Sequence, residues 1–180
     1  MLHLIVGPMF SGKSTRLIYY IRKYKTLDYP LFVVKPTIDD RYDASNVCSH
    51  NQEKETCHLL DVDNLHAMFD DPAYQASKVV LIEEAQFFTG LVSCVQRMLD
   101  QDQKMVYISG LNGDCNRHVF GEIHLLLPLC SSIEFLNALC MTCKDGTPAI
   151  YSKRLTTDAK QVVVAGSDGY ESVCHKHYLH

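Results

Sequence analysis

Residues 7–14, which read GPMFSGKS, fit the pattern G-x-x-x-x-G-K-[ST]. The two glycines of this pattern let backbone N–H groups turn toward one anion at the positive end of the following helix. Lys13 can reach the β- and γ-phosphates of a nucleotide, and the hydroxyl of Ser14 can bind Mg²⁺. A short apolar run precedes the pattern and a helix-type stretch follows it, as the motif requires. The sequence therefore predicts a phosphate-binding loop.

A second group of chemically useful residues follows an apolar run at 78–82, where the chain continues with Glu83 and Glu84. An acidic residue at the end of a buried strand is typical of a site where a carboxylate holds Mg²⁺ or its waters. Neighbouring residues of a strand point to opposite faces, so we expect the two carboxylates to have different roles. One would hold the waters of Mg²⁺, and the other would accept a proton from a nucleophile.

Two short motifs near the C-terminus carry metal-binding residue types. They are Cys140-Met-Thr-Cys143 and Cys174-His-Lys-His177. Two such pairs suit a tetrahedral Zn²⁺ site of the Cys₃His type, with His180 as a possible substitute for the histidine. A metal bound there would tie the two ends of the intervening segment, which could then arch over a neighbouring cleft.

The elements that must position these groups alternate between strand-type and helix-type stretches. Such alternation is typical of βαβ units and predicts an α/β fold with a parallel sheet covered by helices, like that of the P-loop NTPases. We expect a helix to begin at Asp61, which is a good N-cap residue. The expected strands are 3–6, 31–35, 78–82, 104–108 and 132–136, and the expected helices are 13–24, 61–69 and 86–99.

The character of the sequence changes near Ala138. We expect residues 1–138 to form the α/β domain and residues 139–180 to form a small zinc-binding lobe. Two further runs in this lobe, 149–153 and 161–165, have the composition of strands.

Length and composition narrow the classes of protein that are possible. A chain of 180 residues with 47% hydrophobic residues suits one domain with a small appendage. The net charge is −4, and no stretch is polybasic, so binding to nucleic acid or to a membrane surface is not favoured. We find no secretion signal and no run of about 20 apolar residues, so we expect a cytoplasmic protein with its eight cysteines reduced.

Taken together, the motifs resemble those of the type II thymidine kinases, a family that includes the cytosolic cellular enzyme and the poxvirus enzymes. The resemblance extends over nearly the whole chain. Besides the motifs above, it rests on EEAQFF at 83–88, DDRY at 39–42, GLNGDCNRHVFG at 110–121, YSKRL at 151–155 and GYESVCHKHY at 169–178. It implies ATP-dependent phosphorylation of the 5′-hydroxyl of thymidine to thymidine monophosphate, a step of deoxynucleotide salvage.

The resemblance also implies roles for individual residues. Glu84 matches the carboxylate that takes the 5′-hydroxyl proton, Lys13 acts with it in catalysis, and Glu83 and Ser14 match the Mg²⁺ site. The implied nucleotide- and phosphate-binding residues are Gly7, Pro8, Met9, Phe10, Ser11, Gly12, Lys13, Ser14, Asp39, Asp40, Arg41, Glu83, Gln86 and Arg154. The implied thymidine-binding residues are Met9, Phe87, Leu111, Cys115, Gln161, Val162, Val163, Val164, Ala165 and Tyr170. The implied zinc ligands are Cys140, Cys143, Cys174 and His177.

The chain departs from the family pattern mainly between residues 110 and 121. Asp114 replaces a threonine, and Cys115 replaces a phenylalanine beside the sugar and base. Elsewhere, Glu83 stands where the family usually has aspartate, and Arg16 stands where glutamate is common. One alternative is therefore phosphotransfer to deoxyuridine or deoxycytidine, and another is a zinc module that binds a nucleotide without catalysis. The resemblance further implies a homotetramer that is inhibited by thymidine triphosphate.

Overall fold

The computed structural model describes residues 1–39, 46–48, 53–158, 160–163 and 165–180. Three residues of the expected site, Asp40, Arg41 and Val164, lie outside the described residues. No helix in the described ranges is long and apolar enough to cross a membrane.

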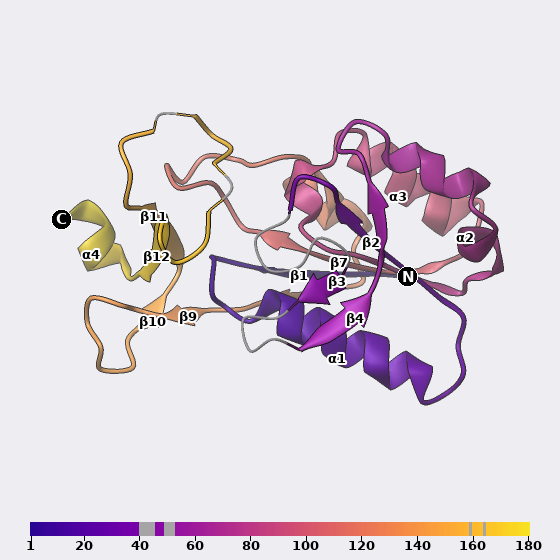
Figure 1. Cartoon of the computed structure of the whole chain (residues 1–180), viewed down its shortest axis with the longest axis horizontal. Helices are drawn as coiled ribbons and strands as arrows, with labels where there is room; N and C mark the ends of the chain where they lie inside the picture. Colours follow the sequence, from indigo (N-terminus) through magenta and orange to yellow (C-terminus); the bar gives the residue numbers. More distant parts are fainter. Residues whose placement is uncertain (40–45, 49–52, 159, 164) are drawn as a thin grey trace.

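A six-stranded parallel sheet forms the centre of the described structure (Figure 1). The strand order is β5-β2-β6-β7-β1-β8, and each neighbouring pair runs in the same direction. The bounds are β1 Leu2–Gly7, β2 Leu31–Pro36, β5 His58–Leu60, β6 Val79–Ile82, β7 Met105–Leu111 and β8 Ser132–Phe135. The predicted α/β class is therefore confirmed, and β5 is a strand that the sequence did not predict.

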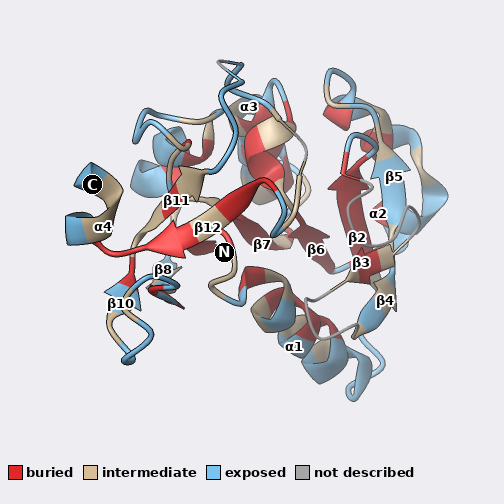
Figure 2. Cartoon of the chain, turned by 60° about the vertical axis from the view of Figure 1, so that its left-hand side comes forward, coloured by how far each residue is buried: buried red, intermediate tan, exposed pale blue. Residues whose placement is uncertain are grey.

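Helices cover both faces of this sheet because its central strands are apolar on both sides. Helix α1, Lys13–Lys25, packs through Leu17, Ile18 and Ile21 on one face. The opposite face is covered by α3, Leu91–Asp100, and by two 3₁₀ helices, η1 (Leu65–Asp70) and η3 (Ile123–Leu129). Figure 2 shows the buried central strands between α1 and α3. Helix α2, Pro72–Ala76, follows η1.

Two helix predictions were wrong at their starts. Asp61 does not cap a helix, because its carboxylate accepts the N–H of Asp63 at 3.0 Å in a tight turn, and η1 begins only at Leu65. The helix expected from residue 86 is interrupted. A short 3₁₀ turn, η2 (Ala85–Phe87), comes first, and α3 begins after Gly90, whose φ of 66° is left-handed.

The C-terminal region forms two small antiparallel pairs. Strand β9 (Ala138–Leu139) pairs with β10 (Pro148–Ala149), and β11 (Tyr151–Arg154) pairs with β12 (Tyr170–Val173). The last element is α4, His175–Leu179. The strand expected at 161–165 was wrong, since its described residues, 161–163 and 165, are irregular. A third antiparallel pair, β3 (Asn46–Cys48) with β4 (Lys54–Thr56), lies near α1.

A small apolar cluster of its own holds the C-terminal region together. It contains Ala138, Ala149 and Val173, together with Cys140 and Cys174. Phe10, from the turn after β1, packs against this cluster. The backbone N–H of Met9 also donates to the hydroxyl of Ser152 on β11 at 2.9 Å. The C-terminal region therefore contacts and stabilises the turn that leads into α1.

Candidate active site

The 7–14 loop joins the carboxyl end of β1 to the first turn of α1, and its two glycines have different physical roles. Gly12 precedes the helix with a φ of 85°, a conformation that side-chain-bearing residues rarely adopt. Gly7 is needed for close approach, since a Cβ there would lie 2.2 Å from the backbone oxygen of Leu136. The loop can therefore take this path only with glycine at both positions.

Two side chains of the 7–14 loop point to an anion site. Lys13 is buried, and its Nζ donates to the backbone oxygen of Pro8 at 2.7 Å, so the ammonium group lies against the loop. The hydroxyl of Ser11 is buried and has no hydrogen-bond partner among the described residues. A buried hydroxyl without a partner is costly. A phosphate oxygen held in the loop would supply the missing acceptor.

Glu83 lies directly beside the 7–14 loop. The hydroxyls of Ser14 and Ser109 both donate to its carboxylate, and Glu83 itself is almost fully buried. Burial, reinforced by the neighbouring charge of Glu84, raises the pKa of Glu83 to about 7. The structure thus brings together the two residues, Ser14 and Glu83, that the sequence assigned to Mg²⁺. The carboxylate and hydroxyl oxygens are donors that suit this ion.

The expectation that Glu83 and Glu84 point to opposite faces of a strand was wrong. Strand β6 ends at Ile82, and Glu84 has the left-handed backbone angles φ 49° and ψ 43°. Because the chain turns there, both carboxylates line one small pocket with Ser14 and Asp39. Lys35 also lines this pocket, with its Nζ 3.8 Å from the carboxylate of Asp39.

The side chain of Gln86 connects Glu84 to the end of β7. Its Nε2 donates to the Glu84 carboxylate at 2.5 Å, and its Oε1 accepts the backbone N–H of Leu111 at 3.1 Å. Gln86 is only 3% exposed, so this arrangement is enclosed. The sequence assigned Gln86 to the phosphates, whereas its amide here orients the carboxylate of Glu84.

The expected thymidine-binding residues fall into two groups. Leu111 and Phe87 lie near Glu84, and the ring of Phe87 meets that of Phe120 edge-to-face at 5.4 Å. The second group lies in and beside the segment between β11 and β12, where the hydroxyl of Tyr170 donates to the backbone oxygen of Val163 at 3.0 Å. Two other expected residues lie elsewhere: Met9 is buried next to β11, and Cys115, in the 110–121 loop, is half-buried. Val162 and Ala165 lie in the irregular segment before β12.

Arg154 is the last residue of β11, at the start of the segment that joins β11 to β12. Its guanidinium donates to the hydroxyl of Tyr170 at 2.7 Å and to three backbone oxygens, at 2.6 to 3.0 Å. These oxygens belong to Asp158, Lys160 and Gln161. The resemblance implied a contact with phosphate, but here these donors fold the β11–β12 segment.

Sequence reasoning missed three residues that contribute to this site. They are Ser109, which donates to Glu83; Phe120, which packs on Phe87; and Ser152, which accepts from Met9. Ser109 was detectable in principle, since it is a polar residue in the otherwise apolar run of β7. Ser152 could not be found in the same way, because it lies in the mostly polar strand β11, where a serine does not stand out.

The four predicted zinc ligands come together. The ligand atoms of Cys140, Cys143, Cys174 and His177 all lie within 4.8 Å of one another. The Sγ atoms of Cys143 and Cys174 are 3.8 Å apart, and the three sulfurs are 3.3 to 3.5 Å from Nδ1 of His177. A tetrahedral Zn²⁺ site with Zn–S bonds of about 2.3 Å has sulfur atoms about 3.8 Å apart. The cluster therefore fits zinc, with His177 rather than His180 as its fourth member.

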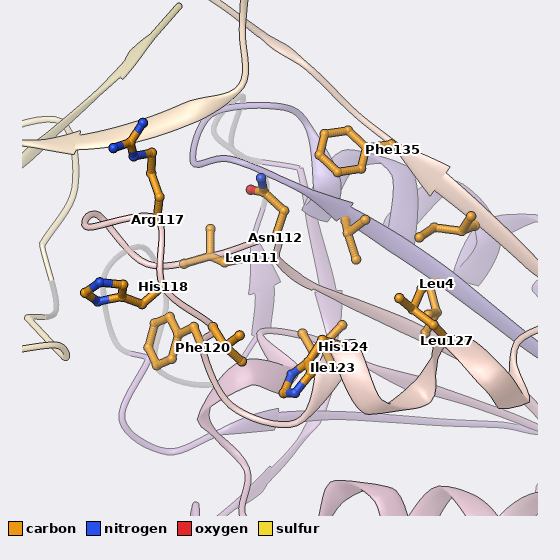
Figure 3. Close-up of a pocket in the computed structure, with 13 residues that line it drawn as sticks. Leu4, Leu111, Asn112, Arg117, His118, Phe120, Ile123, His124, Leu127 and Phe135 are labelled. Carbon is orange, nitrogen blue, oxygen red and sulfur yellow. The ribbon is translucent and has the colours of Figure 1, made fainter. Parts of the chain in front are cut away.

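A separate apolar cavity of about 230 Å³ lies between β1, β8 and η3 (Figure 3). Leu4, Leu127 and Phe135 line one side of it, and Arg117 and His118 lie at the other. Of the expected thymidine-binding residues that the structure describes, only Leu111 lines this cavity. It is therefore distinct from the pocket that contains Glu83 and Glu84.

Together these features define an α/β protein whose glycine-lysine loop, at the carboxyl end of β1, faces an acidic pair at the carboxyl end of β6, with β7 between the two strands. The family model described as "Thymidine kinase" matches residues 1–178. The chain is 37% identical to the thymidine kinase of Rabbit fibroma virus (strain Kasza), over 99% of this chain and 96% of the relative. It is 34% identical to the thymidine kinase of Oryza sativa subsp. japonica, over 99% of this chain and 66% of the relative. The chain belongs to the thymidine kinase family.

Proposed function

We propose that this protein transfers the terminal phosphoryl group of ATP to the 5′-hydroxyl of thymidine, giving thymidine monophosphate for deoxynucleotide salvage. The observation that carries the proposal is the shared pocket of Ser14, Glu83 and Glu84 beside the 7–14 loop. It supports a phosphate site, a cation site and a base within one small volume. A phosphoryl transition state needs these groups, because catalysis depends mainly on positioning and on stabilising negative charge.

On the phosphate side, the backbone amides of residues 7–14 bind the phosphates. Lys13 neutralises their charge, and the hydroxyl of Ser11 gains an acceptor. By the family resemblance, we assign Asp39, Asp40 and Arg41 to the nucleotide. Ser14 and Glu83 would hold Mg²⁺ directly or through water, and the ion would reduce the charge repulsion among the phosphate oxygens.

On the nucleoside side, Glu84 accepts the proton of the 5′-hydroxyl as the oxygen attacks phosphorus. A carboxylate suffices as this base because the hydroxyl keeps its proton until late in the transfer. Gln86 holds the carboxylate in place through its amide. The thymine lies among Met9, Phe87, Leu111, Cys115 and Tyr170, to which we add Phe120, and the backbone of residues 161–165 reads its polar edge.

Several further properties belong to the same proposal. Residues 1–138 act as the kinase domain, and residues 139–180 act as a lobe in which Cys140, Cys143, Cys174 and His177 would hold zinc at both ends of the segment that covers the nucleoside. The active form is a cytoplasmic homotetramer, and thymidine triphosphate is its feedback inhibitor. Its partners are small molecules rather than nucleic acid or membrane.

A second acceptor is worth testing because the nucleoside side departs from the family at Asp114 and Cys115. Loss of an aromatic surface beside the sugar and base would weaken the preference for thymine. Deoxyuridine and deoxycytidine are therefore the competing acceptors. The competing class of function is a zinc module that binds a nucleotide without transferring phosphate.

The test is to incubate the purified protein with labelled ATP, Mg²⁺ and a panel of thymidine, deoxyuridine and deoxycytidine. We expect labelled thymidine monophosphate to form fastest. Glu84→Gln should lower kcat by about 10²- to 10⁴-fold while ATP binding is retained, because only the proton acceptor is removed. The matched control is Glu53→Gln, on an exposed ion pair with Arg22, which should keep full activity.

Two outcomes would overturn the proposal. A wild-type protein that binds ATP and phosphorylates none of the three nucleosides would be a binding module. An unchanged kcat in Glu84→Gln would remove Glu84 from the reaction.

A further inference from the structure

Asp114 is a buried carboxylate on the nucleoside side of the site. Its side chain is 2% exposed, although aspartate is seldom buried without partners. One of its oxygens, Oδ1, accepts the backbone N–H groups of Asn116 at 2.9 Å and His118 at 2.8 Å. These bonds fold the turn at 114–118 and leave the second oxygen, Oδ2, available for another partner.

Nδ1 of His118 lies 3.9 Å from Oδ2, and the hydrogen-bond donor to Oδ2 comes from the segment between β11 and β12. We call this segment the flap; its described residues are 155–158, 160–163 and 165–169. Nε2 of Gln161 donates to Oδ2 of Asp114 at 2.9 Å, and it also approaches the backbone oxygen of Val119 at 3.2 Å. The Gln161 amide thus joins the flap to the 110–121 loop at two points.

Hydrogen bonds from the two flanking strands hold the flap in one conformation, so one further contact can fix its position. The guanidinium of Arg154 donates to the backbone oxygens of Asp158, Lys160 and Gln161. The hydroxyl of Tyr170 donates to the backbone oxygen of Val163. Both anchoring residues lie on the paired strands β11 and β12. A contact at Gln161 is therefore transmitted to the rest of the flap.

We propose that Asp114 and Gln161 form a clasp that holds the flap against the 110–121 loop and so controls how tightly the nucleoside is bound. This inference rests on the proposed function, because the proposed function places the nucleoside between the flap and the 110–121 loop. A closed flap excludes water and retains the substrate, and a ligand that needs the closed form binds more weakly when that form is less populated. The clasp acts on the nucleoside and not on ATP, so Asp114 and Gln161 are positioning residues.

The first measurement is on Gln161→Leu, which removes the amide and keeps a similar size. Because Gln161 lies on an exposed part of the flap, the variant should still fold, with a small drop in the thermal midpoint because the buried Oδ2 of Asp114 loses a donor. We expect the KM for thymidine to rise about tenfold, the effect of losing a hydrogen bond to a charged group. The KM for ATP should stay within about twofold on the same reasoning. Hydrogen exchange of the flap amides should be faster.

Two further variants test the chemistry of the clasp. Gln161→Glu places a second carboxylate against Asp114, and it should raise the nucleoside KM more than Gln161→Leu does. Asp114→Asn keeps an acceptor for the turn and offers an amide that Gln161 can meet by rotating its own amide. The nucleoside KM of Asp114→Asn should therefore lie between that of the wild type and that of Gln161→Leu. The matched control is Thr157→Ala, at an exposed flap residue outside the clasp, which should leave KM and exchange unchanged.

The double variant Asp114→Asn/Gln161→Leu decides whether the two residues act together. If they form a clasp, its nucleoside KM should equal that of Gln161→Leu, because one substitution has already broken the link. A KM equal to the product of the two single effects would show independent action and overturn the clasp.

Failure of the clasp differs from failure of the proposed function. If the wild type phosphorylates no nucleoside, the function is wrong, and flap exchange still reports on the clasp without any substrate. If the enzyme is active but Gln161→Leu has wild-type KM and wild-type flap exchange, the function stands and the clasp is wrong.

Discussion

The two loops beside the acidic pair Glu83 and Glu84 are held by different kinds of interaction. The 7–14 loop depends on backbone geometry: a glycine with positive φ at Gly12 and a close approach to Leu136 at Gly7. The 110–121 loop depends on side chains: the carboxylate of Asp114 folds its turn, and Gln161 ties it to the flap. The hydroxyl of Tyr178 adds a third tie by donating to the backbone oxygen of Cys115 at 2.8 Å.

This difference follows from what each loop binds in the proposed reaction. The phosphate groups are the same whichever nucleoside accepts them, so a loop made of backbone amides and one lysine serves every substrate. The base and sugar differ among nucleosides, and side chains can be exchanged one at a time to suit them. The substitutions at Asp114 and Cys115 fall on the loop where such exchange is possible.

The largest effect on stability and turnover should come from replacing a glycine of the 7–14 loop by alanine, compared with the same replacement in the 110–121 loop. Gly7→Ala puts a Cβ 2.2 Å from the backbone oxygen of Leu136, whereas Gly113→Ala meets the backbone oxygen of His118 at 3.2 Å. We expect Gly7→Ala to lower the free energy of unfolding by about 3 kcal/mol and to abolish turnover, because the backbone itself must move. Gly113→Ala should cost less than about 1 kcal/mol.

Urea denaturation of both variants measures the free energy of unfolding, and steady-state kinetics measures turnover. Gly113→Ala serves as the control, since it carries the same substitution into the loop built by side chains. Equal losses of stability in the two variants would contradict the distinction between the loops.

Much of the fold was predictable because the sheet is buried on both faces. Its central strands must then be apolar runs, and the runs at 31–35, 78–82 and 104–108 were found within a few residues of β2, β6 and β7. Strand β5, His58–Leu60, was missed because it is short and mostly exposed, so hydrophobic periodicity gives little signal. The helix starts failed where a local turn competed, at Asp61 and at Glu84.

The site was predictable only where its residues are close in sequence. The 7–14 loop, the acidic pair and the two cysteine motifs are local patterns, and the structure brings their members together. The contacts of Ser109 with Glu83 and of Asp114 with Gln161 join residues that are distant along the chain. One sequence gives no information about such pairs, since no local spacing rule relates them.

A smaller effect should follow from restoring an aromatic ring on the nucleoside side. Cys115→Phe returns the residue type that the family has beside the sugar and base. We expect the KM for thymidine to fall about fivefold, which is within the range of an aromatic stacking contact. Steady-state kinetics with thymidine and deoxycytidine would measure it, and the improvement should be greater for thymidine.

Cys115→Ser is the matched control, because it replaces the thiol without adding a ring and should leave the KM within about twofold of wild type. A KM that rises in Cys115→Phe, or that changes equally in both variants, would mean that residue 115 does not face the base.

The smallest effect should come from an ion pair between α1 and β8 that includes Arg16. Arg16 on α1 donates to the carboxylate of Glu134 on β8 at 2.6 Å, and Tyr20 donates to it at 2.5 Å. Burial raises the pKa of Glu134, but these hydrogen bonds outweigh it, so the net pKa is lowered. A lowered pKa in the folded state stabilises the fold above the ordinary carboxylate pKa, and this stability is lost as pH falls through the lowered value.

Glu134→Gln should therefore lower the free energy of unfolding by about 0.5–1 kcal/mol at neutral pH, since Arg16 is 42% exposed at its side chain and the pair is screened by solvent. The difference from wild type should disappear in acid, where the wild-type carboxylate is protonated and no longer carries a charge. Urea denaturation at several pH values measures this, with the exposed Glu53→Gln as control. A deficit that persists in acid would show that Glu134 contributes by packing. The kinetic constants should not change, because neither Arg16 nor Glu134 is among the described residues that line the pocket of Ser14, Glu83 and Glu84.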